Sequence, residues 1–367
     1  MIDFRRSLPP HVSELHSYID AALRTVSATN DVGLLMRQSV ARGSEREREA
    51  GAKFLRARFG HDIEPSRVIL TNGTQNALLV LLQMLVGAGG LLVAERLTYG
   101  SLRSLARIAN VRTEGIDVDA DGIIPEAFEA VCRSKRPKAL YCNPTVQNPT
   151  TAIMPEARRL AIINVARRYG VPIIEDDALG RLHLQAPRPI AAIAPDLTWY
   201  VMSTTKCLAQ GLRLAYLVSP RAAGAEQVIA PVEHLSYWHA APIGAALVTQ
   251  WITSGIADQI TNRIAQECAA RERLARDVLC DVDVQSVPGG MHIWINLPAR
   301  LDRHELVADA QRLGVLMRPS DLFAIDEQPV PNAIRLALSP PADVPEVRRG
   351  LLILRDLMHE AATSIRA

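Results

Sequence analysis

The sequence predicts an α/β protein with a mainly parallel, seven-stranded sheet in a large domain and a second, smaller α+β domain. Three observations support this expectation. Short apolar runs alternate with helical patterns through the middle of the chain, the pattern changes to long helical sequence after Pro220, and two more strand patterns follow in the last third. Apolar strands that alternate with helices are typical of parallel sheets covered on both faces.

Seven runs carry the strand pattern, at 68–70, 91–94, 113–118, 139–142, 172–175, 199–202 and 214–218. Helical patterns such as 155–169 separate several of them, so ligands are expected beyond the carboxyl ends of the strands. The uncharged stretch 76–94 is divided by Gln83 and by a glycine-rich group at 87–90. Neither part reaches the roughly 20 residues that a membrane span requires, and we interpret the stretch as a buried helix followed by a buried strand.

The last third begins with an extended amphipathic helical pattern at 256–279. Strand patterns at 291–297 and 333–338 follow, with a helical pattern at 302–313 between them. We therefore expect a large domain over residues 45–255. The smaller domain is expected to combine residues 256–367 with the N-terminal segment, residues 1–44.

The composition limits which partners and which cellular compartment we expect. The 367 residues are 48% hydrophobic and 22% charged, with a net charge of +2, and no dense run of basic residues suggests a nucleic acid or a membrane as partner. Five cysteines without a Cys-x-x-Cys spacing indicate neither a disulfide framework nor a zinc site. The N-terminus has an acid and prolines where a signal peptide needs an apolar core, so we expect a cytoplasmic protein.

Lys206 is the residue around which a chemical site can be assembled. The chain has only four lysines, and this one follows an apolar strand and three small polar residues. An amine forms an imine with an aldehyde, which a guanidinium cannot do, whereas the hydroxyls of Ser203 and Thr205 and the charge of Arg213 suit a phosphate. Together they suit pyridoxal 5′-phosphate. Taken alone, the segment is also compatible with a surface lysine after a strand.

A glycine-containing turn follows the strand at 68–70. The strand ends near Gly73, a helix begins at about Thr74, and Gln75 comes next. Free N–H groups at a helix start favour an anion. The alternative is simple helix capping by Asn72 or Thr74.

Three consecutive carboxylates, Glu175, Asp176 and Asp177, lie at the end of the strand pattern 172–175 and directly after it. One carboxylate in such a position can keep the pyridine nitrogen of the cofactor protonated, which makes the ring an electron sink. An acidic triplet can also bind a metal, but no His or Cys lies within the segment. We expect no metal.

Two polar side chains lie in loops after strands. Asn148, in the second of two Asn-Pro turns, can donate to the phenolate oxygen of the cofactor ring, although Pro144 and Pro149 also suit a merely rigid loop. Tyr99 lies just past the strand at 91–94 and can stack on the ring, or else pack on the surface.

Arg335 lies within an otherwise apolar strand pattern. A buried guanidinium is costly unless it meets an anion, and a substrate carboxylate bound through two hydrogen bonds is a suitable partner. An internal Asp or Glu would satisfy it as well.

These segments, in this order, resemble the fold-type I pyridoxal-phosphate enzymes, most closely the class I/II aminotransferases and the aminotransferase-like domain of MocR-type proteins. The resemblance runs from about Ala41 to the C-terminus. It implies that Lys206 is the catalytic Schiff-base lysine and that Arg335, with Asn148, binds the substrate. The cofactor-binding residues that it implies are Gly73, Thr74, Gln75, Tyr99, Asn148, Asp176, Ser203, Thr205 and Arg213.

The sequence departs from the family in three places. In the N-terminal segment, residues 36–38 (Met-Arg-Gln) stand where relatives usually carry a tyrosine that reaches the neighbouring subunit's site. Thr151 replaces the glycine of the family's Asn-Pro-Thr-Gly pattern. The tyrosine that the family carries two or three residues after the aspartate, as a second donor to the phenolate oxygen, is absent, and Ala178 and Leu179 stand there. The loss of that donor should raise the pKa of the imine.

The resemblance implies a homodimeric aminotransferase that moves an amino group between an amino acid and a 2-oxoacid through a Lys206 Schiff base. Another reaction on the same fold, such as β-elimination, decarboxylation or oxidation, is the nearest alternative, since fold does not determine chemistry. A non-enzymatic, ligand-sensing protein is the alternative from another class, because residues 289–294 look MocR-like. Only about 70 residues precede the Gly-Thr-Gln turn, whereas such regulators carry a DNA-binding domain there, and this favours an enzyme.

Overall fold

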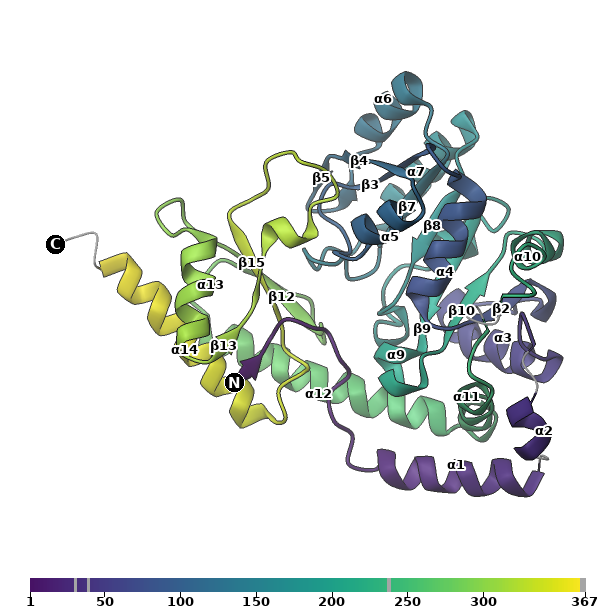
Figure 1. Ribbon diagram of the computed structural model, residues 1–367. Helices are drawn as coiled ribbons and strands as arrows, with labels where there is room; N and C mark the ends of the chain where they lie inside the picture. The colour runs from purple at the N-terminus through teal and green to yellow at the C-terminus, as the bar shows by residue number, and fades with distance from the viewer. Residues whose placement is uncertain (30–31, 38–39, 236–238, 364–367) are drawn as a thin grey trace.

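The computed structural model describes residues 1–29, 32–37, 40–235 and 239–363 (Figure 1). Its large sheet has seven strands in the order β2-β10-β9-β8-β7-β3-β4. They are β2 (Val68–Thr71), β10 (Ala215–Val218), β9 (Thr198–Ser203), β8 (Ile173–Asp176), β7 (Ala139–Cys142), β3 (Leu91–Glu95) and β4 (Arg112–Ile116). The strands from β9 to β4 are parallel, and β10 is antiparallel to both neighbours. The mainly parallel seven-stranded sheet is confirmed.

One predicted strand is divided in the structure. The run 113–118 ends as β4 at Ile116, and Val118 begins a separate short strand, β5 (Val118–Asp119), which pairs with β6 (Gly122–Ile123). Asp117 lies between the two strands and accepts hydrogen bonds from Arg96 Nε and Nη2 at 3.0 and 2.7 Å. A charged side chain that bonds outside the sheet therefore interrupts the predicted run.

Helices cover both faces of this sheet, as continuously apolar strands require. One face is covered by α4 (Thr74–Leu81), α5 (Leu102–Ile108) and α10 (Ala222–Ile229). The other is covered by α3 (Glu45–Phe59), α6 (Pro125–Lys135), α7 (Glu156–Tyr169) and α11 (Pro242–Ser254). The stretch 76–94 is the predicted buried helix and strand, since α4 leads through one π-helical turn (Leu82–Val86) into β3.

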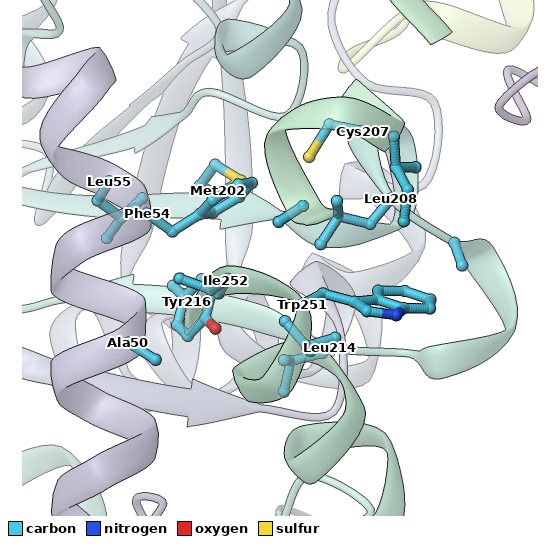
Figure 2. Packing of buried hydrophobic residues seen from close by; sticks show 14 of the residues in the cluster. Ala50, Phe54, Leu55, Met202, Cys207, Leu208, Leu214, Tyr216, Trp251 and Ile252 are labelled. Carbon is cyan, nitrogen blue, oxygen red and sulfur yellow. The ribbon is translucent and has the colours of Figure 1, made fainter. Parts of the chain in front are cut away.

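Apolar packing on one side holds the turn that carries Lys206 in place. Lys206 lies in the short helix α9 (Thr204–Cys207), and the next two side chains, Cys207 and Leu208, are buried. Figure 2 shows them in a cluster that α3, α11 and strands β9 and β10 also build. Its other labelled members are Ala50, Phe54, Leu55, Met202, Leu214, Tyr216, Trp251 and Ile252. Tight packing on one side of the turn leaves Lys206 to point to the other.

A long helix connects the large sheet to a second, smaller one. Helix α12 (Ile256–Val278) leads to an antiparallel, four-stranded sheet made of β11 (Val284–Gln285), β12 (His292–Asn296), β15 (Ala333–Ala337) and β14 (Arg318–Pro319). The central pair, β12 and β15, are the two predicted strands. The predicted helix between them is α13 (Arg303–Arg312), and Asp302 caps it by accepting from the N–H groups of His304 and Glu305. Helix α14 (Val344–Thr363) packs with α12 and α13 around the small sheet.

The N-terminal segment runs between the two sheets (Figure 1). Strand β1 (Ile2–Asp3) pairs in parallel with β13 (Val315–Leu316), and Phe4 is buried in the apolar cluster of the small sheet. The chain then leads to α1 (Leu15–Thr29), which packs against α11, and to α2 (Val32–Arg37). Residues 5–8 thereby form part of a cavity wall. Within the described residues, no helix has both the length and the apolar character needed to cross a membrane.

Candidate active site

One cavity lies between the carboxyl ends of the large sheet's strands and the small sheet. All eleven residues singled out from the sequence line it, although they are spread from position 73 to position 335. They are Gly73, Thr74, Gln75, Tyr99, Asn148, Asp176, Ser203, Thr205, Lys206, Arg213 and Arg335. The strands bring them together because the loops after β2, β3, β7, β8 and β9 open toward the same space.

Lys206 reaches into this cavity from a capped turn. Ser203 caps α9 by accepting from the Thr205 N–H at 3.1 Å, and the two hydroxyls bond to each other. The Lys206 ammonium donates to the backbone oxygen of Ser7. Burial, reinforced by the charge of Arg335, lowers the pKa of Lys206 to about 8. A larger share of the side chain is therefore uncharged amine at neutral pH than in an exposed lysine.

The three consecutive carboxylates face different surroundings because side chains alternate along a strand. Glu175 accepts two backbone N–H bonds at 2.9 and 2.8 Å from the start of the short helix α8 (Ile190–Ile193). Asp177 forms a buried ion pair with Arg58 at 2.8 Å. Only Asp176 lines the cavity. The triplet is therefore not a shared ligand set for a metal.

Asp176 presents one carboxylate oxygen to the cavity. Its Oδ2 accepts from the Tyr141 hydroxyl at 2.8 Å, whereas Oδ1 is buried without a hydrogen-bond partner. The side chain of Asn143 donates to the backbone oxygen of Asp176, and this bond holds the end of β8 in place. Burial raises the pKa of Asp176 to about 6, so the group is mostly ionised at neutral pH. An ionised carboxylate with one free oxygen fits a protonated ring nitrogen.

The start of α4 offers a site for an anion. Gly73 begins this helix with φ +81°, and no side chain caps it, so the expected alternative of capping by Asn72 or Thr74 is not found. A Cβ added at Gly73 would lie 3.5 Å from Arg213 Nη2, which shows how closely this guanidinium approaches the helix start. The backbone N–H of Arg213 donates to Gln210, but within the described residues no hydrogen bond or ion pair engages its side chain. Open N–H groups beside an unpaired guanidinium fit a phosphate.

Arg335 is held in place without a carboxylate partner. Its side chain is buried, Nη1 donates to Asn148 Oδ1 at 2.9 Å, and Nη2 donates to the Arg5 backbone oxygen at 2.6 Å. Its Cζ lies 4.9 Å from the centre of the Phe323 ring. Burial lowers the pKa of Arg335 to about 9. No Asp or Glu among the described residues pairs with it, which leaves an anionic ligand as the natural partner.

Two further contacts orient the predicted loop residues. Gln75 Nε2 donates to the Tyr99 hydroxyl at 2.8 Å, so the start of α4 and the loop after β3 support each other. Because Asn148 uses its side-chain oxygen for Arg335, its amide nitrogen remains available to donate. Tyr99 lines the cavity and does not pack on the outer surface.

Comparison with known proteins identifies the family. Residues 14–351 match the family described as aminotransferase class I and II. The chain belongs to the class I and II aminotransferases. The predicted fold and the predicted family are confirmed, and this family uses the predicted cofactor, pyridoxal 5′-phosphate.

Individual relatives include both regulators and enzymes. An uncharacterized HTH-type transcriptional regulator of Bacillus subtilis (strain 168), YdeF, is 27% identical over 317 residues, which cover 86% of this chain and 67% of the regulator. A 2-aminoadipate transaminase of Thermus thermophilus is 26% identical over 272 residues, covering 71% of this chain and 68% of the enzyme. This chain thus spans about two thirds of the length of either relative.

Solved structures support the fold. An archaeal alanine:glyoxylate aminotransferase superposes with a TM-score of 0.88 at 22% identity, over 98% of this chain and 91% of that one. At this identity the likeness concerns the fold, and the site must be argued from the residues themselves.

Two of the three departures from the class I and II pattern have structural correlates, and the third, at residues 36–38, extends outside the described residues. Thr151, in the place of the family glycine, adopts φ +69°, the left-handed conformation that glycine favours. The loop therefore keeps its shape with a residue that is strained in it. Leu179 lines the cavity and brings no hydroxyl. The second donor expected from the aminotransferase pattern is thus missing at this position.

Several cavity residues were not identified from the sequence. They are Arg5, Arg6, Ser7, Asn143, His292, Arg318 and Phe323, together with Tyr141 behind Asp176. One of them had a usable signal, since Arg318 lies in the apolar run 315–319 as Arg335 lies in its strand. The N-terminal residues had none, because a two-residue strand carries no periodic pattern.

Proposed function

We propose that this chain is a pyridoxal-phosphate-dependent aminotransferase that moves an amino group between an amino acid and a 2-oxoacid, with Lys206 as its catalytic residue. The observation that carries the proposal is the position of Lys206. Its amine lies in one cavity with the free oxygen of Asp176 and the guanidinium of Arg335, which has no carboxylate partner among the described residues, and the pKa of Lys206 is lowered to about 8. This arrangement supplies a reactive amine, a partner for the ring nitrogen and a receptor for a carboxylate.

The cofactor would be held at three points. Arg213, Ser203, Thr205 and the open start of α4 would bind its phosphate, and Asp176 would accept a hydrogen bond from its ring nitrogen. Tyr99 would lie against the ring, and the amide nitrogen of Asn148 would donate to its phenolate oxygen. When bound, pyridoxal 5′-phosphate supplies an aldehyde that bonds to amines and a ring that withdraws electrons from the substrate.

The chain's own residues would then bind the substrate and move a proton. Arg335 would bind the substrate carboxylate through its guanidinium, which Asn148 and Phe323 already orient. Lys206 lines the same cavity as Arg335. The uncharged Lys206 amine would take the proton from Cα and later return a proton, as a general base and then a general acid. Its lowered pKa matches this task near neutral pH.

We propose that the two parts of the chain bind different ligands. The larger part, residues 45–255, would carry all the cofactor contacts, from Gly73 to Arg213. The smaller part, residues 1–44 with 256–367, would carry the substrate carboxylate contact at Arg335. A homodimer in the cytoplasm is likewise proposed. It is supported by membership of the family and by the absence of a Cys-x-x-Cys spacing, and light scattering on the purified protein would test the dimer.

A ligand-sensing role is the second candidate, favoured by the likeness to the Bacillus subtilis regulator. Incubation of the cofactor-loaded protein with a panel of amino acids and 2-oxoacids separates the candidates. Transamination predicts a change of the cofactor spectrum with an amino acid, reversal by a 2-oxoacid, and equal amounts of new oxoacid and new amino acid. Ammonia, carbon dioxide or peroxide as a product would indicate another reaction. A spectral response without any product would support sensing.

The substrate arginine offers a direct control for this experiment. Arg335→Ala should weaken substrate binding by about 2–5 kcal/mol, since it removes one partner of a desolvated charge pair. It should leave cofactor binding intact, because Arg335 lies on β15 and not among the proposed cofactor contacts. Equal loss of the cofactor would show that Arg335 has a structural role instead.

A further inference from the structure

A second arginine lies beside Arg335 in the cavity wall. Arg318 on β14 is the direct cross-strand neighbour of Arg335 on β15, and both line the cavity. Residues directly opposite in an antiparallel pair project to the same face, with their Cβ atoms about 5 Å apart. Two like charges in this relation destabilise a sheet. The pair is therefore a costly arrangement unless an anion lies between or beside the two guanidinium groups.

The two arginines differ in their protein partners. Arg335 bonds to Asn148 and to the Arg5 backbone, and it lies over the Phe323 ring. Within the described residues no hydrogen bond or ion pair engages the side chain of Arg318, and its Nε is buried without an acceptor. Burial, reinforced by the charges of Arg5 and Arg6, lowers the pKa of Arg318. The side chain of Arg318 thus has a partly buried charge with no direct partner among the described residues, and the carboxylate of Asp3, which is paired with Arg5, offsets it only in part.

The charge balance of the cavity leads to the same conclusion. Six cationic side chains and a single carboxylate, that of Asp176, line it. His292 is uncharged at neutral pH, because burial lowers its pKa to about 3. Arg5 is already paired with Asp3 at 2.9 Å. The proposed cofactor and the α-carboxylate of a substrate would engage Arg213, Lys206 and Arg335, which leaves Arg318 and Arg6.

We propose that Arg318, with Arg6 at its rim, forms a second anion-binding subsite that receives the side-chain carboxylate of an acidic amino acid and of the corresponding 2-oxoacid. The proposal rests on the proposed function and adds the substrate class. A guanidinium binds a carboxylate through two parallel hydrogen bonds, and an amino acid with an uncharged side chain would bring only the one carboxylate that Arg335 receives.

Unreactive substrate analogues test this subsite without any turnover. Calorimetric titration of the cofactor-loaded protein compares each dicarboxylate with the monocarboxylate of equal chain length. The pairs are succinate with butyrate, glutarate with valerate, and adipate with hexanoate. Wild-type protein should prefer the best dicarboxylate by at least about tenfold, which is the effect expected of one additional charged hydrogen-bonded pair. Arg318→Met should weaken that dicarboxylate about 10- to 100-fold and leave its monocarboxylate unchanged.

Two further variants control the measurement. Arg318→Lys should show an intermediate affinity, because the charge remains but the two-pronged geometry is lost. Arg312→Met makes the same change at an exposed arginine of α13 and should bind every analogue as wild type does. The unfolding temperature of Arg318→Met should equal or exceed that of wild type, since the substitution removes a like-charge contact. A marked drop would instead make Arg318 a structural residue and overturn the proposal.

Turnover of glutamate and of norvaline, which have the same chain length, distinguishes the failure of the subsite from the failure of the proposed function. If the protein transaminates amino acids but Arg318→Met impairs both substrates and both analogue series equally, the subsite is refuted and the function stands. If the dicarboxylate preference depends on Arg318 but neither substrate nor any other amino acid reacts, the subsite stands and the aminotransferase activity is refuted.

Discussion

The neighbouring carboxylates of Asp176 and Asp177 should respond in opposite directions to the same substitution. In protein freed of cofactor, Asp176→Asn should raise the free energy of unfolding at pH 8, because it removes a buried charge with one unpartnered oxygen. Burial raises the pKa of this carboxyl from 3.8 to about 6. At about 1.4 kcal/mol per pKa unit, the ionised carboxylate costs about 3 kcal/mol, most of which asparagine would restore.

The gain should depend on pH in a defined way. A carboxyl whose pKa is raised in the folded protein keeps its proton there while the unfolded chain ionises. Wild-type protein therefore loses stability as the pH rises from about 4 to about 6, and the loss then levels off. The difference between Asp176→Asn and wild type should be about 3 kcal/mol at pH 8, about half as large at pH 5 and near zero below pH 4.

Asp177→Asn is the matched control, one residue along the chain. It breaks the ion pair with Arg58, in which both side chains are at most 1% exposed, and leaves a buried charge without compensation. We expect a loss of about 3–5 kcal/mol. Urea denaturation followed by circular dichroism, at one protein concentration, measures both variants. If Asp176→Asn and wild type have the same free energy of unfolding at pH 8, or if the variant is as much more stable than wild type at pH 4 as at pH 8, burial does not destabilise the ionised form of this carboxylate.

Three further predictions concern the lysine, the loop and the missing donor. Borohydride treatment of the cofactor-loaded protein and peptide mapping should label Lys206; label on Lys53, or none, would contradict the assignment. Thr151→Gly should raise the free energy of unfolding by about 1 kcal/mol, because it relieves a left-handed φ. A lower urea midpoint would mean that the lost side-chain packing outweighs the strain. Leu179→Tyr should lower the pH at which the absorbance of the bound cofactor titrates by about one to two units, since a donor is added to the ring oxygen. Equal midpoints in the two spectrophotometric titrations would show that position 179 does not face that oxygen.

Most of the large sheet was predictable because its strands are short apolar runs separated by helical patterns. All seven predicted runs are found as strands. The predicted strand 113–118 was too long. Asp117 bonds to Arg96 in a tertiary contact, which the local sequence pattern cannot show. The first strand, β1, was not predicted, since it has two residues and pairs with β13 more than 300 positions away.

The cavity was predictable where a residue conflicts with its local pattern. Lys206 after a strand, Arg335 within an apolar strand and Asp176 at a strand end are all such conflicts, and all three line the cavity. Arg318 has the same kind of signal and was overlooked. Tyr141 was not identifiable, because a tyrosine in a strand fits the strand pattern, and only the fold shows that its hydroxyl meets Asp176.

The contacts of residues 5–8 make the N-terminal segment part of the cavity wall. The Ser7 carbonyl accepts from the Lys206 ammonium, and the Arg5 carbonyl accepts from one nitrogen of Arg335, so two cationic groups of the cavity are tied to the backbone of this segment. If a ligand binds only when the segment is displaced, its apparent affinity is lowered in proportion to the fraction of molecules in which the segment is displaced. The pairing of β1 with β13 holds the start of the segment, so a substitution that weakens this pairing would act on the cavity without changing a binding residue.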